Sequence, residues 1–156
     1  MLAAFDSFRS FDSLRPLPSL RGLALALALA ALPFAVPAGA TTIIVTSTLD
    51  LEADDGLCTF REAATATNTD VTTGVTPGEC AAGSAGDTIL FALPAGSTIA
   101  LSALPMIFTQ PVDILGPGHA ALDIQQSVQQ RVLVLDGNAT VDSSFTLSGL
   151  SITGGV

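Results

Sequence analysis

The acidic stretch that begins at Asp50 is the densest group of side chains able to do chemistry in this sequence. It places four carboxylates within six residues, namely Asp50, Glu52, Asp54 and Asp55. Carboxylate oxygens are the ligands that Ca²⁺ prefers, so this stretch is a candidate calcium site, and calcium is the only cofactor that the sequence suggests. It departs from the EF-hand pattern, because Gly56 comes one place late and Arg61 stands where the bidentate glutamate belongs. The alternative is a solvated turn, since Asp and Gly favour turns.

A second set of carboxylates is spread along the C-terminal half and raises the question of carbohydrate cleavage. Its members are Asp113, Asp123, Asp136 and Asp142. Glycosidases need two carboxylates at a defined separation, and a lyase needs a basic partner, for which only Arg131 is present in this half. Asp136 lies in a DGN turn, and the lone His119 lies in a GPGHA turn. Because no nucleophile elbow, phosphate-binding loop or HExxH motif accompanies them, we predict no catalytic residue in this chain.

Arg61 and Glu62 are adjacent charges, but neighbouring helix positions do not face each other. Glu62 lies three residues after Thr59, and this TxxE pattern predicts a capping box at the start of a helix. Arg61 has five hydrogen-bond donors, so we expect it to bond to loop carbonyls or to a carboxylate such as Asp87.

Cys58 and Cys80 are the only two cysteines in the chain. In an oxidising compartment such a pair favours a disulfide, and closing this loop of roughly 22 residues stabilises the fold by about 3 kcal/mol. A metal site is the alternative, but the single histidine, His119, lies far along the chain and completes a poor ligand set.

Residues 1–40 have the pattern of an export signal. Three arginines precede the apolar run LALALALAAL, and small residues at Ala38 and Ala40 predict cleavage after Ala40. The apolar run is about half of the ~20 residues that a permanent transmembrane helix needs. We therefore expect a protein of the periplasm, cell surface or medium, with an uncleaved signal anchor as the alternative.

Removal of residues 1–40 leaves a strongly acidic domain. Two arginines and no lysine then face twelve carboxylates, which gives a net charge of −10. Such a domain repels phosphate backbones and anionic headgroups, so nucleic-acid and membrane-surface binding are disfavoured. The chain has no Trp and no Tyr, so its core must come from aliphatic residues and Phe.

The remaining chain divides into a mixed part, residues 41–86, and a repetitive part, residues 87–156. The first part predicts a strand at 41–49, a helix at 58–68 and a surface loop at 70–86 that Cys80 tethers. In the second part short apolar runs alternate with turn clusters, one of which is LPMIFTQ, at spacings near ten residues. The runs cover residues 88–93, 97–102, 111–115, 121–125, 131–135 and 145–153.

Two architectures fit these short strands: an antiparallel sandwich and a parallel β-helix. The tail SGLSITGG favours the β-helix, because Leu147, Leu150 and Ile152 alternate as inward positions beside glycines suited to tight corners.

Several motifs resemble one family. The segment DGLCTFREAATATN, with Cys58, Arg61, Glu62 and Ala63, is similar to the Cys-Ser/Thr-Leu-Arg-Glu-Ala-Ile motif of the CSLREA domain, which opens many secreted bacterial β-helix proteins. Phe60 replaces the usual Leu, and Ala64 replaces the usual Ile. The segments GECAAG, GDTILFALPAG, LPMI, VDILGPG and LSGLSITGG follow in the expected order. The resemblance implies a mainly β fold, with an N-terminal cap before about three coils of a right-handed, pectin-lyase-like parallel β-helix.

The resemblance also shapes our functional expectation. Family members continue for more coils after TGG, so we expect a fragment whose C-terminal end is aggregation-prone or paired with further coils or a surface partner. We predict an exported, non-catalytic scaffold, the N-terminal part of a cell-surface or adhesin-like protein. The alternatives are the N-terminal region of a polysaccharide lyase or glycoside hydrolase whose active site lies beyond Val156, and a degenerate fragment without a role.

Overall fold

Short alternations of aliphatic and polar residues build nearly all the secondary structure of this chain. The computed structural model describes residues 39–102, 104–137 and 144–156, so the predicted export signal up to residue 38 and Asp142 lie outside the described residues. The described residues all belong to one compact unit. Within the described residues the order is β1 (Thr42–Val45), α2 (Phe60–Thr69), β2 (Asp87–Phe91), β3 (Ser97–Leu101), β4 (Met106–Phe108), β5 (Val112–Leu115), β6 (Leu122–Gln126), β7 (Leu133–Leu135), β8 (Phe145–Ser148) and β9 (Ser151–Gly154).

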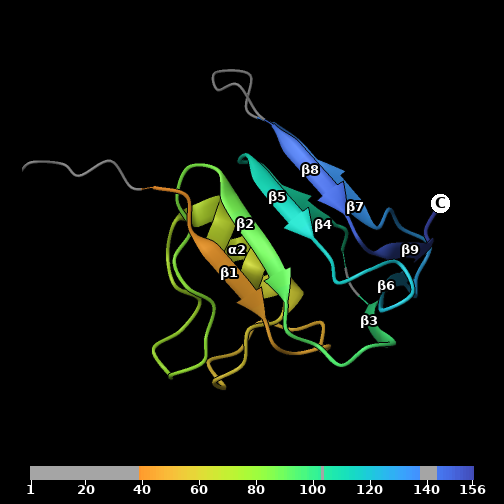
Figure 1. The fold of residues 1–156 in the computed structure, drawn as a ribbon, viewed down its shortest axis with the longest axis horizontal. Helices are drawn as coiled ribbons and strands as arrows, with labels where there is room; N and C mark the ends of the chain where they lie inside the picture. Colours follow the sequence, from red (N-terminus) through yellow and green to blue (C-terminus); the bar gives the residue numbers. More distant parts are fainter. Residues whose placement is uncertain (1–38, 103, 138–143) are drawn as a thin grey trace, which may run out of the picture. The chain divides into compact units, whose positions relative to one another are not determined.

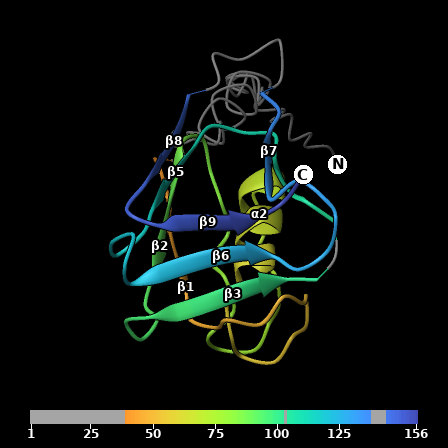
Figure 2. The ribbon, with the colours of Figure 1, turned by 90° about the vertical axis from the view of Figure 1, so that its right-hand side faces the viewer.

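The strands form three parallel sheets that the chain visits in a repeating order (Figure 1). Sheet A has the order β1-β2-β5-β8, sheet B the order β3-β6-β9, and sheet C pairs β4 with β7. The chain passes from A to B to C and then returns to A, so β2, β3 and β4 form one circuit and β5, β6 and β7 the next. Figure 2 shows β3, β6 and β9 running in the same direction, one beside the next. The fold is therefore mainly β with parallel sheets, and the antiparallel sandwich is wrong.

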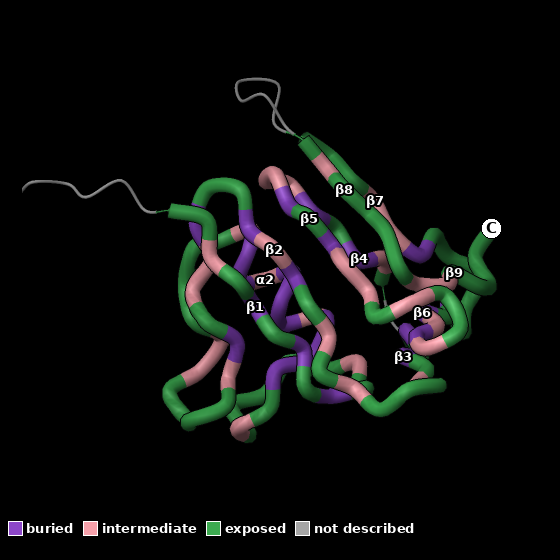
Figure 3. Tube along the Cα trace, viewed as in Figure 1, coloured by how far each residue is buried: buried purple, intermediate pink, exposed green. Residues whose placement is uncertain are grey.

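The core consists of inward positions that stack from one circuit to the next. In sheet A, Ile43 pairs with Ile89 and Ile89 with Ile114, and in sheet B Ile99 pairs with Ile124. All five side chains are buried. Between them the strand residues are more exposed, as the alternating colours of β1 and β2 in Figure 3 show. This period-two alternation is the pattern that a strand with one dry face produces.

Several predicted boundaries differ from the structure, and three of the differences have a clear cause. The first strand ends at Val45, because the amides of Thr46 and Ser47 turn to the carbonyl of Cys58. The helix begins at Phe60 instead of residue 58, since Thr59 is its extended N-cap, and it ends at Thr69 before the left-handed Asp70. The run 145–153 is two strands in different sheets, because the chain turns between them at Gly149, whose φ is +67°.

Strand β4 was missed in the sequence, which predicts only a turn at LPMIFTQ. Met106 and Phe108 nevertheless point into the core and are 1% and 0% exposed. The strand has three residues and directly follows Pro105, so it has no local signal beyond two apolar positions. Its pairing with β7, about 27 residues later, determines it.

Stacked corners bring two glycines into backbone contact. A Cβ on Gly116 would lie 2.2 Å from the carbonyl oxygen of Gly149, which belongs to the next circuit. Gly116→Ala is therefore expected to lower the free energy of unfolding by about 1–3 kcal/mol through overpacking. Urea unfolding is the measurement. Gly96→Ala serves as a reference for backbone strain alone, because a Cβ there meets nothing within 4 Å while its φ of +81° disfavours any side chain. Gly116 does not have a left-handed φ, so a Gly116→Ala variant as stable as the unaltered chain would show that contact between corners contributes nothing.

Candidate functional site

The start of helix α2 is fastened to the acidic segment in front of it. The Thr59 hydroxyl accepts from the Glu62 amide at 3.1 Å, and the Glu62 carboxylate accepts from the Thr59 amide at 2.8 Å, which is the capping box that the TxxE pattern predicts. The other Glu62 oxygen accepts from the Ala53 amide, and the Thr59 hydroxyl donates to the Leu51 carbonyl. Glu62 is only 1% exposed, so this polar group is buried and has partners. The cap therefore also anchors residues 51–53.

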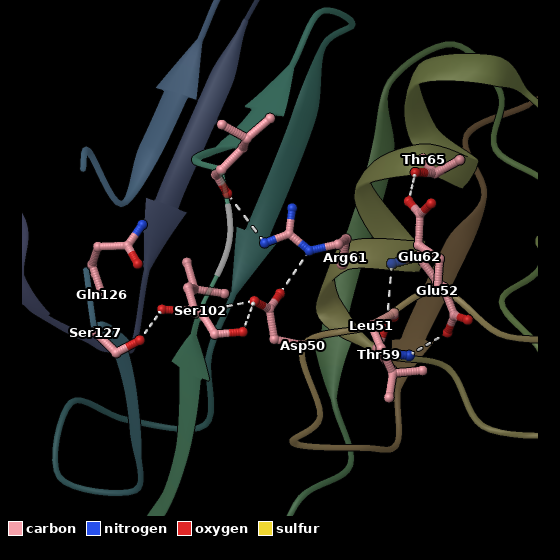
Figure 4. Close-up of polar contacts among 12 residues, drawn as sticks. Asp50, Leu51, Glu52, Thr59, Arg61, Glu62, Thr65, Ser102, Gln126 and Ser127 are labelled. Atoms are coloured by element: carbon pink, nitrogen blue, oxygen red, sulfur yellow. Dashed lines mark hydrogen bonds and ion pairs between the residues drawn. The ribbon is translucent and has the colours of Figure 1, made fainter. Parts of the chain in front are cut away.

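Arg61 joins this segment to the first circuit of strands (Figure 4). Its Nε donates to Asp50 Oδ1 at 2.7 Å, and an outer nitrogen donates to the Leu104 carbonyl at 3.1 Å. The second Asp50 oxygen accepts from the amide and hydroxyl of Ser102, directly after β3. The expected bond to a loop carbonyl is confirmed. The suggested carboxylate partner, Asp87, is wrong, because Asp87 lies beside Ala66 and Thr67 near the other end of the helix.

Asp50 makes stability depend on pH in a defined direction. Burial raises the pKa of this carboxyl, but the hydrogen bonds from Arg61 and Ser102 outweigh burial and hold the pKa below the usual 3.8. A lowered native pKa stabilises the fold above the unfolded value, and this contribution is lost as pH falls through the native pKa.

Asp50→Asn is therefore expected to cost about 1–3 kcal/mol at neutral pH and to flatten the loss of stability below pH 3.8. Urea unfolding between pH 2 and pH 7 measures both effects. Asp113→Asn, on an exposed position of β5, is the matched control. The ion pair has no such role if the two variants show the same pH dependence.

Asn68 covers the edge of strand β4, and sequence reasoning did not single it out. Its side-chain amide donates to the Ile107 carbonyl at 2.7 Å, and its oxygen accepts from the amide and hydroxyl of Thr109. Its own carbonyl accepts from the Gln110 side chain. These bonds occupy backbone groups at the end of sheet C that would otherwise form an open strand edge. The only local signal is a side chain that can both donate and accept, placed in the last turn of the helix.

The disulfide Cys58–Cys80 is confirmed, and it joins the residue before the N-cap of α2 to the end of the loop that follows this helix. Both cysteines are 1% exposed. Hydrogen bonds also join the loop before Cys80 to the acidic segment, with carboxylates of both segments as acceptors. Asp54 accepts from the amides of Val75 and Thr76, and Glu79 accepts from the amides of Asp55 and Gly56.

The four carboxylates of the candidate calcium site thus have separate partners. Asp50 bonds to Arg61 and Ser102, Glu52 to the Thr65 hydroxyl, Asp54 to the loop amides, and Asp55 to the Leu57 amide. In the part of the chain that the structure describes, no three acidic, histidine or cysteine residues gather as potential metal ligands. What this segment does in the structure is to connect loop, helix and strand.

The carboxylates of the C-terminal half lie apart from this region and on different strands. Asp113 is on β5 in sheet A, Asp123 is on β6 in sheet B and accepts from the Thr153 hydroxyl, and Asp136 follows β7. Arg131 and His119 are exposed in turns. The structure therefore brings none of these three carboxylates together by strand pairing.

The two ends of the strand stack differ. At the α2 end, Phe60 contacts Phe91 and Phe108 with ring centroids 5.4 and 5.9 Å apart, so the helix closes the core. At the opposite end, Leu147 and Ile152 occupy inward register positions beside Ile114 and Ile124 but are 37% and 41% exposed. A hollow of about 480 Å³ opens there, lined by Val132, Leu133, Leu135, Leu147, Ile152 and Val156 among others.

Comparison of the chain with known protein families, with curated proteins and with solved structures finds no match. Among the helices that the structure describes, none is long and apolar enough to cross a membrane.

Proposed function

We propose that this chain is an exported, non-catalytic scaffold of the CSLREA type. Its circuits are the coils of a right-handed parallel β-helix, its residues 41–86 are the cap of that helix, and it forms the N-terminal part of a cell-surface or adhesin-like protein. The repeating A, B, C order of the parallel sheets supports the β-helix. Connections between parallel strands are right-handed in nearly all proteins, which supports the handedness.

The observation that carries this proposal is the difference between the two ends. Arg61, Asn68 and Phe60 cover the first circuit with hydrogen bonds and aromatic contacts. Leu147 and Ile152 leave the last circuit apolar and open. A stack of this kind gains stability when a further layer of strands covers its open end, because each layer buries the apolar face of the one before it. The cap therefore serves to start and protect a stack that other strands extend.

The disulfide supports the proposed location. Structural disulfides persist in oxidising compartments and are rare in the cytosol. The acidic charge keeps such a domain soluble there and disfavours anionic partners.

The test is to express the full chain in a Gram-negative host. We expect the product in the periplasm or medium, with Thr41 as its first residue, a β-dominated circular dichroism spectrum and no thiol that reacts, even in urea, before a reductant is added. Full-length chain in the cytoplasm, or labelling of both cysteines in the native protein, would contradict the proposal. Incubation with a panel of acidic polysaccharides is expected to release neither reducing ends nor unsaturated products, and release of either would favour a lyase or hydrolase instead.

A further inference from the structure

Asp87, the first residue of β2, has a buried carboxylate of which one oxygen lacks a hydrogen-bond partner within the described residues. Its side chain is 0% exposed. Oδ1 accepts from the Thr41 amide at 3.2 Å, from the Ser84 amide at 2.8 Å and from the Ser84 hydroxyl at 3.1 Å. Oδ2 is buried and has no hydrogen-bond partner within the described residues. A buried carboxylate is costly unless a cation or enough donors compensate its charge, so this group needs a further partner.

No cation in the described structure supplies that partner. Burial raises the pKa of Asp87 above its usual value and outweighs the hydrogen bonds from Thr41 and Ser84, and the negative charge of Asp70 acts in the same direction as burial. Of the arginines outside residues 1–40, Arg61 bonds to Asp50 and Arg131 is exposed in the turn before β7. Of the two backbone nitrogens that donate to Asp87 Oδ1, those of Ser84 and Thr41, only the Thr41 nitrogen lies beside the predicted cleavage site.

We propose that hydrolysis of the Ala40–Thr41 peptide bond turns the Thr41 nitrogen into the cation that pairs with Asp87. A peptidase of the export pathway adds water across this bond, which leaves a carboxylate on Ala40 and an amine on Thr41. The amine takes up a proton, because an α-amino group has a pKa of about 7.7–8.0. This inference rests on the proposed export and cleavage after Ala40. Its consequence is that maturation itself completes the polar core beside Asp87.

The geometry around the bond suits this step. Gly39 and Ala40 are exposed, so the bond is accessible, whereas Thr41 is half-buried. The Thr41 carbonyl accepts from the Thr88 amide at 2.8 Å, a bond that the cut leaves intact and that keeps the new terminus in place.

Ser84 gives a second reason. Its hydroxyl has one proton, which the Gly39 carbonyl at 2.7 Å and Asp87 Oδ1 at 3.1 Å both attract. Loss of Gly39 ends this competition. The Ser84 hydroxyl then keeps the Thr41 hydroxyl as a neighbour, at 3.0 Å. An ammonium also has three donors where the Thr41 amide has one, so it can offer Asp87 more than one N–H.

The absence of lysine makes this proposal directly testable, because the α-amine is then the only primary amine after cleavage. The compact unit starts before Thr41, so two chains can be compared: one released from a cleavable carrier to begin at Thr41, the other at Gly39. The measurement is the rate of acylation of the amine at pH 8, in the native state and in urea. In the chain that begins at Thr41 we expect a native rate about fivefold lower than the rate in urea, because raising a pKa of about 8 by one unit lowers the unprotonated fraction at pH 8 from about a half to about a tenth. We also expect a Tm about 4–8 °C higher than that of the chain that begins at Gly39.

Asp87→Asn in the chain that begins at Thr41 is expected to restore fast acylation. Equal native rates and equal Tm values for the Thr41 and Gly39 chains would overturn the pairing, and this comparison needs no core substitution, so it holds even if the Asp87 variant does not fold. The N-terminal sequence of the chain recovered from the periplasm tests the cleavage separately. Another first residue there would overturn the maturation step, whereas retention of full-length chain in the cytoplasm would count against the proposed export.

Discussion

Replacing Phe60 by alanine is expected to lower the free energy of unfolding by about 3–5 kcal/mol. The side chain is 0% exposed and lies between Phe91 of β2 and Phe108 of β4, so its removal opens a cavity where the helix meets two sheets. For a domain of this size a loss of that magnitude lowers Tm by well over 10 °C. Thermal and urea unfolding of the variant and of the unaltered chain measure the effect.

A control must separate the cavity in the core from the loss of an apolar side chain in general. Val75→Ala is the control, because Val75 is 92% exposed in the loop before Cys80 and should change stability by less than about 0.5 kcal/mol. Phe60→Leu, which keeps a large apolar side chain in the same place, should lose much less stability than Phe60→Ala. A Phe60→Ala variant as stable as the Val75→Ala variant would show that α2 does not close the core.

Removal of the disulfide is the second large effect that we expect. The double variant Cys58→Ala with Cys80→Ala should lose about 3 kcal/mol, because the bridge restricts a loop of 22 residues in the unfolded chain. The loss should appear as a lower urea midpoint. The amides of Thr46 and Ser47 bond to the Cys58 carbonyl, and the Cys58 amide bonds to the Thr46 hydroxyl. Cys58 also directly precedes Thr59, the N-cap of the helix. Removal of the bridge should therefore also cause the end of β1 to fray.

A chemical control separates the bridge from the packing of the two sulfur atoms. Unfolding of the unaltered chain in excess reductant should give nearly the same midpoint as the double alanine variant. A reduced chain as stable as the oxidised one would mean that the hydrogen bonds of Asp54 and Glu79 alone hold the loop in place.

Side chains of α2 explain why strand β4 does not expose an open edge. Asn68 and Arg61 bind carbonyls at Ile107 and Leu104, and the Thr109 amide binds Asn68. The backbone groups of an uncovered parallel edge would be free to pair with another chain. In the segment from Asp50 to Cys80, the side chains of helix α2 therefore take the place of a neighbouring strand along β4.

Local sequence determined the features that depend on residues close together. The capping box needs only Thr59 and Glu62 at a spacing of three, and most strands needed only an apolar run between turn residues. The chain has only two cysteines, so composition alone predicted their pairing.

Features that depend on groups far apart in the sequence could be seen only in the tertiary structure. Strand β4 exists because β7 pairs with it, and Asn68 has its role because Ile107 and Thr109 lie beside the helix end. The partner of Arg61 is Asp50 and not Asp87, since the two carboxylates lie near opposite ends of α2. The physical reason is common to all three: a side chain or strand bonds to whatever unpaired group the fold places within about 3 Å, and one-dimensional spacing carries no information about which group that is.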